Sequence, residues 1–199
     1  MSYKRRAVGV AAVAICLVLA AACTGSQVTP TGPAPSLPGT PGHFNDGQES
    51  FDYPADWPVR SGGYGAQIEY VLAVLGDGTW QDGCNLSSGV ACPDTVSVAP
   101  GQILVKVFRW WGGPFVPCQG DTRANATFGD LAVRKVVNNA VITWEIRVPG
   151  NEFGQNNNIF VEVHASDPAQ LARAEVMVAS FRWGPGSIGD GAGCSPSPS

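Results

Sequence analysis

Histidine is the side chain most often used as a general base near neutral pH, and this chain contains two of them. His164 is followed by Ser166 and Asp167, so a base, a hydroxyl and a carboxylate occur within four positions. Ser and Asp are, however, equally typical of the residues that begin a helix. No GxSxG or SxxK motif occurs anywhere in the sequence. A hydrolase that uses His164 and a nearby carboxylate is therefore an alternative hypothesis rather than the leading one.

The most unusual segment for ligand binding is FRWWGGPFVPC, residues 108–118. Adjacent residues of a strand face opposite sides, so only one of its two neighbouring tryptophans can lie in the core. The other could stack on a sugar or on an apolar ligand, or it could simply cover a loop. We expect a ligand- or partner-binding surface centred on this segment, at Arg109, Trp110, Trp111 and Phe115.

The N-terminus has the three parts of an export signal, with basic residues at 4–6, an apolar run at 7–22 and small residues at its end. The run is shorter than the about 20 residues that a transmembrane helix needs. The sequence AAAC that ends at Cys23 resembles the lipobox of bacterial lipoproteins. That resemblance implies that Cys23 carries acyl chains such as palmitate and becomes the first residue of the mature chain. An uncut membrane anchor is the alternative.

The segment after Cys23 is rich in Pro, Gly, Thr and Ser and carries no charge up to residue 42. Such a composition cannot bury enough surface to fold, and it suits an extended tether. We therefore divide the chain into a signal peptide (1–22), a tether (23–43), a single domain (44–194) and a disordered tail (195–199).

The charge of the mature chain excludes some partners. Without the three basic residues of the signal, 9 Lys and Arg stand against 16 Asp and Glu, which gives a net charge near −7. Nucleic acid rewards a basic groove, and anionic lipid rewards a polybasic segment. We therefore expect no nucleic acid partner, and we expect the acyl chains to make the membrane contact.

The remaining cysteines are expected to form disulfides rather than a zinc site. An even number of cysteines in an exported chain favours disulfides, and zinc would need closely spaced Cys or His pairs that are absent here. Cys84 and Cys92 could close a local loop, which would leave Cys118 to pair with Cys194. The two crossed pairings stay open. We expect no metal and no cofactor.

Strand-like patterns dominate the domain, at 50–59, 67–75, 102–110, 131–137, 140–148 and 159–164. Apolar residues occupy the even positions from 68 to 74, before a turn at Gly76-Asp77-Gly78. Asn138-Asn139 is expected to form a tight hairpin turn, because Asn tolerates positive φ. The run Asn156-Asn157-Asn158 is expected to be a solvated loop.

Two strands have clearly different faces. In 140–148 the even positions are apolar and Thr143, Glu145 and Arg147 are polar, so one face should pack and the other should face water. In 159–164 the apolar residues alternate in the same way, which places Glu162 and His164 together on the outward face.

One helix is predicted near the C-terminus. Asp167 can cap it and Pro168 suits its first turn, while an apolar stripe runs from Leu171 to Phe181 and ends before Gly184. We therefore predict an α+β fold, with an antiparallel sheet packed by helices and a prominent C-terminal helix.

Two segments of the domain resemble PsbP-like domains: FDYPADW (51–57), and AEVMVASFRW (174–183), which is similar to that family's terminal helix and strand. The resemblance implies an α/β/α sandwich and a binding or assembly role, because the family's known members act mainly in that way. It transfers no catalytic residue. The insert 77–100 and the segment RWWGGPFVPC depart from the family.

Together these observations predict a non-catalytic lipoprotein on the extracytoplasmic face of the cell membrane. Its domain would bind an envelope protein, a cell-wall component or an apolar ligand. The alternatives are a cell-envelope hydrolase that uses His164, and a structural accessory subunit.

Overall fold

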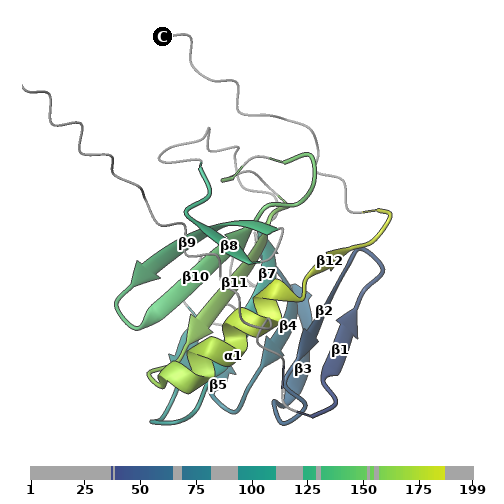
Figure 1. Cartoon of the computed structure of the whole chain (residues 1–199). Coiled ribbons are helices and arrows are strands. Elements are labelled where there is room, and N and C mark those ends of the chain that lie inside the picture. The colour runs from purple at the N-terminus through teal and green to yellow at the C-terminus, as the bar shows by residue number, and fades with distance from the viewer. Residues whose placement is uncertain are drawn as a thin grey trace, which may run out of the picture. The chain divides into compact units, whose positions relative to one another are not determined.

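The computed structural model describes residues 37, 39–64, 69–81, 94–110, 123–128, 131–151, 153–154 and 157–186. All of them belong to one compact unit, Pro35–Ser199. Within these residues the chain forms three β-sheets and one α-helix (Figure 1). Cys23 and the cysteines at 84, 92, 118 and 194 lie outside the described residues, so lipidation and the disulfides stay predictions.

The largest sheet has seven strands in the order β3-β4-β7-β11-β10-β9-β8, and every neighbouring pair is antiparallel. Its strands are β3 (Val59–Tyr64), β4 (Glu69–Leu75), β7 (Leu104–Trp110), β8 (Ala126–Phe128), β9 (Leu131–Asn138), β10 (Val141–Ile146) and β11 (Ile159–His164).

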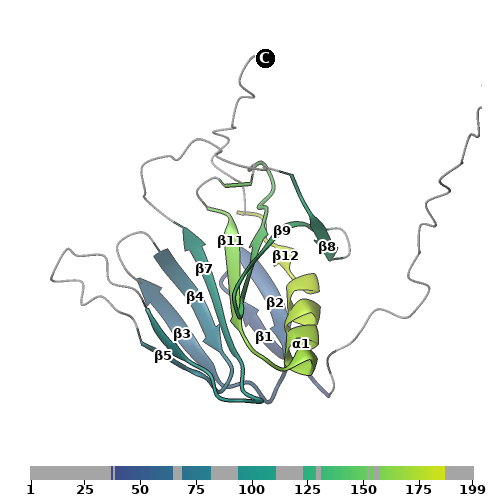
Figure 2. The same ribbon diagram turned by 90° about the vertical axis from the view of Figure 1, so that its left-hand side faces the viewer.

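One face of this sheet, which we call the inner face, is covered by a small sheet and by the helix. The small sheet contains β1 (Gly42–Asn45), β2 (Glu49–Tyr53) and β12 (Arg182–Trp183), and the helix is α1 (Pro168–Ala179). Figure 2 shows α1, β1 and β2 on the same side of β4 and β7. The main core lies between these layers and includes Phe51, Val107, Trp144 and Val178, each at most 1% exposed.

The opposite face, which we call the outer face, carries a short hairpin of β5 (Thr79–Gln81) and β6 (Thr95–Ser97). Trp80 and Val96 from the hairpin pack over Leu104 and Phe108 of β7, and these residues form a second, smaller apolar cluster. Leu104 and Phe108 alternate along β7 with Val105 and Val107 of the main core, so β7 is buried on both faces.

The predicted α+β sandwich is wrong. The part of the chain that the structure describes contains α1 as its single helix, and strands make up most of the fold. A three-stranded sheet stands where we expected a further layer of helix. Phe44 and Phe51 stack at 4.8 Å on β1 and β2, and Phe51 stacks on Phe181 at 4.7 Å. Short strands thus supply the aromatic side chains that close the core, and the molecule is a largely antiparallel β fold.

The C-terminal helix itself is confirmed. The carboxylate of Asp167 caps it by accepting a hydrogen bond from the Ala169 amide at 2.8 Å, and Pro168 is its first residue. Ala174 and Val178 are fully buried against the sheet, as the apolar stripe predicts.

The regular alternation predicted for 67–75 is wrong. A β-bulge lies between Val71 and Ala73, so Leu72 and Ala73 both join the main core while Val71 and Val74 face the outer cluster. Alternation is not required here, because the β5–β6 hairpin covers the outer face and all of Val71–Leu75 is buried.

The hairpin between β9 and β10 is confirmed with a small shift. Asn138 pairs with Val141, so the turn residues are Asn139 and Ala140, one position later than predicted. Asn139 has a φ of 55°, the left-handed conformation that Asn tolerates.

Candidate functional site

The predicted binding segment is only partly described. Trp111 and Phe115 lie outside the described residues. The backbone of Trp110 ends β7 opposite Glu69 of β4, and its side chain also lies outside the described part. Of the four residues, only Arg109 has a side chain in the described part of the structure.

Arg109 forms a buried ion pair with Glu49 of β2. The Arg109 Nε donates to Glu49 Oε1 over 2.9 Å, and a second guanidinium nitrogen donates to Oε2. The Glu49 side chain is 0% exposed and that of Arg109 is 15% exposed. Burial raises the pKa of Glu49 above its usual range, although the guanidinium acts to lower it. The pair ties the small sheet to β7 and occupies two of the guanidinium nitrogens of Arg109.

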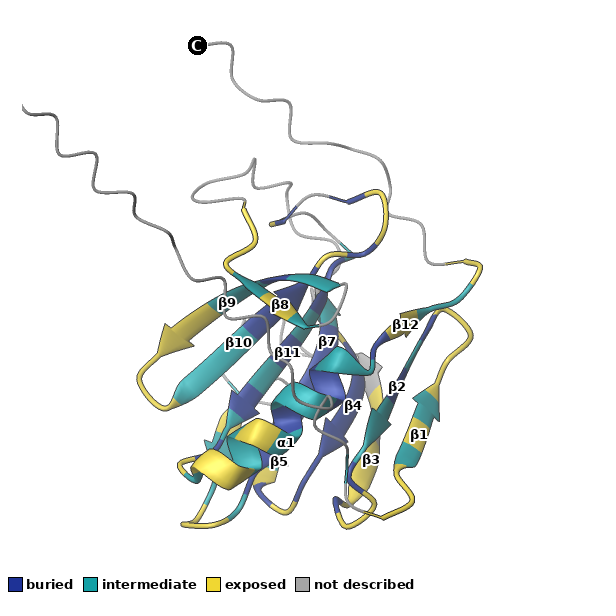
Figure 3. Cartoon of the chain, in the orientation of Figure 1, coloured by how far each residue is buried: buried dark blue, intermediate teal, exposed yellow. Residues whose placement is uncertain are grey.

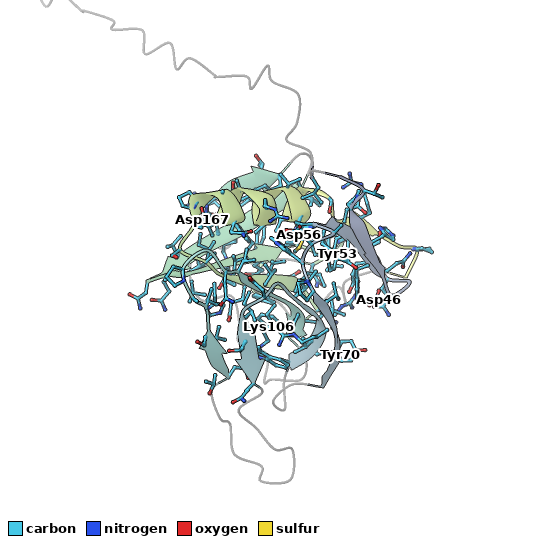
Figure 4. The ribbon with its side chains drawn as sticks, turned by 90° about the horizontal axis from the view of Figure 1, so that it is seen from below. Asp46, Tyr53, Asp56, Tyr70, Lys106 and Asp167 are labelled. Carbon is cyan, nitrogen blue, oxygen red and sulfur yellow. The ribbon has the colours of Figure 1, made fainter. Side chains whose placement is uncertain are left out.

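A second buried ion cluster lies on the outer face, around Lys106 of β7. Its Nζ donates to Glu69 Oε2 and to Asp94 Oδ2, each at 2.5 Å. Trp80 Nε1 donates to the same oxygen of Asp94 over 2.8 Å, and the ammonium lies 4.8 Å from the centre of the Phe108 ring. Figure 4 shows Lys106 on the side of the sheet away from α1. The cluster joins β4, β7 and the β5–β6 hairpin.

The charge state of this cluster argues against a catalytic lysine. Burial lowers the pKa of Lys106, but the hydrogen bonds to Asp94 and Glu69 outweigh it and leave the pKa above its usual range. Burial raises the pKa of Glu69 by more than the hydrogen bond and charge of Lys106 lower it, so this pKa also lies above its usual range. Lys106 therefore holds its proton at neutral pH and cannot act as a base or nucleophile.

The histidine of the alternative hypothesis lies on the outer face of β11. His164 Nε2 is 2.5 Å from Glu162 Oε1, so the two residues share a face, as the alternation predicted. The side chains are 18% and 28% exposed, respectively. Among the described residues, no hydroxyl is hydrogen-bonded to His164. Ser166 and Asp167 precede α1, and Asp167 serves as its cap.

The prediction that Glu145 faces water is wrong, because the turn after β10 covers it. Glu145 is 3% exposed and accepts hydrogen bonds from Arg134, from the Gly154 amide and from Asn158 Nδ2, the last at 2.9 Å. Asn158, expected in a solvated loop, is 0% exposed and also accepts from the Val148 amide. A buried carboxylate at the centre of this turn thus fixes its path.

The sequence interpretation assigned no role to the β9–β10 hairpin, which carries the most exposed apolar side chains of the described chain. Val136 is 52% exposed and Val137 is 62% exposed. Figure 3 shows the end of β9 in the colour of exposed residues. Two consecutive valines in a strand point to opposite faces, so one buried face cannot cover both. Two adjacent valines just before the predicted turn at Asn138-Asn139 were therefore the sequence signal from which an exposed apolar side chain could have been predicted.

The described residues provide no metal site, since no group of three His, Cys, Asp or Glu side chains among them could hold an ion. No helix in the same residues has the length and apolar character that a membrane crossing requires.

Comparison of the chain with protein-family models, with curated proteins and with solved structures found no match. The resemblances to lipoproteins and to PsbP-like domains therefore stay predictions from sequence.

Proposed function

We propose that this protein is a lipid-anchored extracytoplasmic lipoprotein whose β domain binds a protein of the cell envelope and has no catalytic activity. The anchor is the acylated Cys23, and the tether 24–43 connects it to the domain. The observation that carries the binding role is the pair of exposed valines, Val136 and Val137, at the end of β9.

The internal ion pairs support a non-catalytic role. The buried charges around Lys106, Glu49 and Glu145 bond to groups of the domain itself and join its layers. A catalytic acid or base must instead direct its proton toward a substrate. In the described residues, the large apolar side chains that reach solvent are few, and half of them belong to two consecutive residues of β9. They are Val59, Tyr70, Val136 and Val137.

The anchor is tested by the intact mass of the protein extracted from membranes. We expect a chain that begins at Cys23 and carries the added mass of a diacylglyceryl group and a further acyl chain. A Cys23→Ser variant should keep its signal segment and lose the acyl mass. A mature chain that begins at Cys23 without acyl mass would refute the anchor.

The binding surface is tested by a photo-cross-linking amino acid placed at Val137 in the lipidated protein. We expect a discrete adduct with one envelope protein, identified by mass spectrometry. The same probe at Val59, which is 41% exposed on β3 at the other edge of the sheet, is the matched control. Adducts that are identical at both positions, or absent from both, would contradict the proposal.

A cell-envelope hydrolase is the second candidate, because His164 and Glu162 form a close pair on the outer face. It predicts that the purified protein hydrolyses simple esters such as p-nitrophenyl acetate and that His164→Gln removes this activity. Equal rates for the wild type, the variant and the buffer would exclude a hydrolytic role for the pair toward such esters.

A further inference from the structure

The strand β9 has a free edge near its C-terminal end. β8 pairs with β9 only as far as Val133, whereas β10 accompanies β9 to Asn138. In the described part of the chain, the stretch 134–138 therefore has a strand neighbour on one side only. Figure 1 shows the β9–β10 hairpin extending beyond β8.

The open side of this edge is identified by the hydrogen bonds of Asn125. Its amide donates to the Val133 carbonyl over 3.1 Å. Its side chain accepts from the Lys135 amide at 2.6 Å and donates to the Lys135 carbonyl at 2.9 Å. Backbone groups of a strand alternate in direction, so Val133 and Lys135 face away from β10, and the next residue to do so is Val137.

At Val137, in contrast, no side chain of the described residues takes the place of a neighbouring strand as Asn125 does at Lys135. Within the described residues, no hydrogen bond from β8 or from Asn125 reaches its amide or carbonyl on this side. Its side chain is also the most exposed large apolar group of those residues, at 62%. An unpaired backbone and an uncovered apolar side chain thus coincide at one position, the combination that a peptide strand can satisfy.

The Asn125 side chain bonds the backbone of Lys135, the neighbouring outward-facing residue, and a peptide strand could make the same two hydrogen bonds. A side-chain amide has one acceptor and one donor group, as a backbone peptide has, and here it bonds both groups of Lys135. The bonds are exposed to solvent, so their exchange for two equivalent bonds costs little. An incoming strand that displaces the side chain would gain the backbone groups of both Lys135 and Val137.

The chemistry of the edge favours one kind of occupant. Lipid chains offer no hydrogen bonds to the Val137 amide and carbonyl, so membrane insertion would leave them unsatisfied. Two copies that paired through this edge would share a stretch of five residues, 134–138, whereas a stable interface buries about 1,200 Å² or more. A flexible extended segment can place alternate side chains on both faces of the hairpin, and its backbone can bond the open amide and carbonyl of Val137.

We propose that β9 binds an extended segment of another envelope protein as an added strand. The segment displaces the Asn125 side chain, takes backbone hydrogen bonds from Lys135 and Val137, and packs apolar side chains on Val136 and Val137. This inference rests on the proposed binding function and names the mode of recognition. The segment must carry alternating β-branched side chains and must lack proline at the positions that bond to β9.

The test uses a fluorescein-labelled Thr-Val-Thr-Val-Thr-Val-Thr peptide and the full lipidated chain in detergent micelles, with anisotropy as the readout. Asn125→Ala should tighten binding by about threefold, because the competing side chain is gone, and Asn45→Ala is its matched control. Val137→Pro removes one backbone donor and should weaken binding by about tenfold, while Val137→Thr should change it by less than about twofold. The same peptide with N-methyl groups on its bonding edge should not bind.

Amide hydrogen exchange of 134–138 supplies a second readout that does not depend on how well Val137→Pro folds. We expect the peptide to slow exchange at Lys135 and Val137 in the wild type and in Asn125→Ala. Equal binding of the N-methylated peptide, or no effect of Asn125→Ala and Val137→Pro, would overturn strand addition.

The photo-cross-linking result separates this inference from the proposed function. A protein adduct at Val137 that persists unchanged in Asn125→Ala and in the presence of excess peptide would keep the function and overturn strand addition. Adducts only with lipid, or only with a second copy, would overturn both. Loss of the protein adduct on addition of the peptide would support both.

Discussion

The buried pair of Glu49 and Arg109 offers the sharpest test of how the two sheets are held together. In an Arg109→Leu variant, the Glu49 carboxylate stays buried and loses both guanidinium donors. Removing one partner of a buried pair costs about 3–5 kcal/mol, and the 15% exposure of Arg109 favours the lower end of that range. For a domain of this size, about 3 kcal/mol corresponds to a fall in Tm of roughly 6–12 °C.

The expected loss also depends on pH. Burial raises the pKa of Glu49, and loss of the guanidinium, which lowers it, raises it further. A carboxyl group whose pKa is higher in the folded protein stabilises the fold at low pH, and this contribution is lost as pH rises through the folded pKa. The Arg109→Leu variant should therefore be penalised less at about pH 5 than at about pH 8.

The assay is urea unfolding followed by tryptophan fluorescence at both pH values, with a double-mutant cycle. The Glu49→Leu/Arg109→Leu double variant should lie within about 1 kcal/mol of the wild type, because no charge is then left unpaired. Glu175→Gln, which removes the half-exposed partner of Lys135, is the control and should cost less than about 1 kcal/mol. Additive losses in the cycle, or a penalty independent of pH, would refute the assignment of Glu49 and Arg109 as a coupled buried pair.

Three further predictions concern the outer face. Lys106→Met leaves Glu69 and Asp94 close together without their shared cation. Urea unfolding should show that the free energy of unfolding falls by about 3 kcal/mol. A fall of less than about 1 kcal/mol would mean that the cluster does not stabilise the fold. Glu69 has a raised pKa in the folded protein, so it stabilises the fold increasingly as pH falls from neutral toward 4.5; Glu69→Gln should abolish this dependence in denaturation curves, and an unchanged curve would contradict it. Asn158→Ala removes three buried hydrogen bonds, to Val148, Asn151 and Glu145, and should cost about 3 kcal/mol, with faster amide exchange at Gly154 than in the wild type; unchanged exchange would show that Asn158 does not fix the turn.

The features that followed from sequence are those set by local patterns. The inward faces of β10 and β11 and the start of α1 depend on alternation, on helical spacing and on a cap, all of which are read within a few residues. Trp144, Val161 and Asp167 occupy the positions that these patterns predicted. The turn at Asn139 follows in the same way, because its backbone preference is intrinsic to the residue.

The features that escaped prediction depend on contacts between distant segments. Arg109 is 60 residues from Glu49, and a strand pattern cannot show that β2 brings a carboxylate to its inner face. Lys106 looks like an exposed strand residue until the β5–β6 hairpin covers it with Asp94. Sequence therefore predicted α1, most long strands of the large sheet and one of its faces, but not β3, the short strands β1, β5, β6, β8 and β12 or the buried charges.

The candidate surface on β9 adds to the one predicted at the paired tryptophans, whose side chains lie outside the described residues. Rare residues such as Trp110 stand out in a sequence. The open backbone groups of a strand, in contrast, can be located only when the end of its neighbouring strand is known. Val136 and Val137 would have a strand neighbour on both sides if β8 extended four residues farther along β9. Because β8 pairs no farther than Val133, the outward backbone groups of Val137 have no partner in β8, and Val137 is also the most exposed large apolar residue of the described chain. The length of a neighbouring strand, rather than the chemical rarity of a residue, decides which backbone groups remain open to a partner.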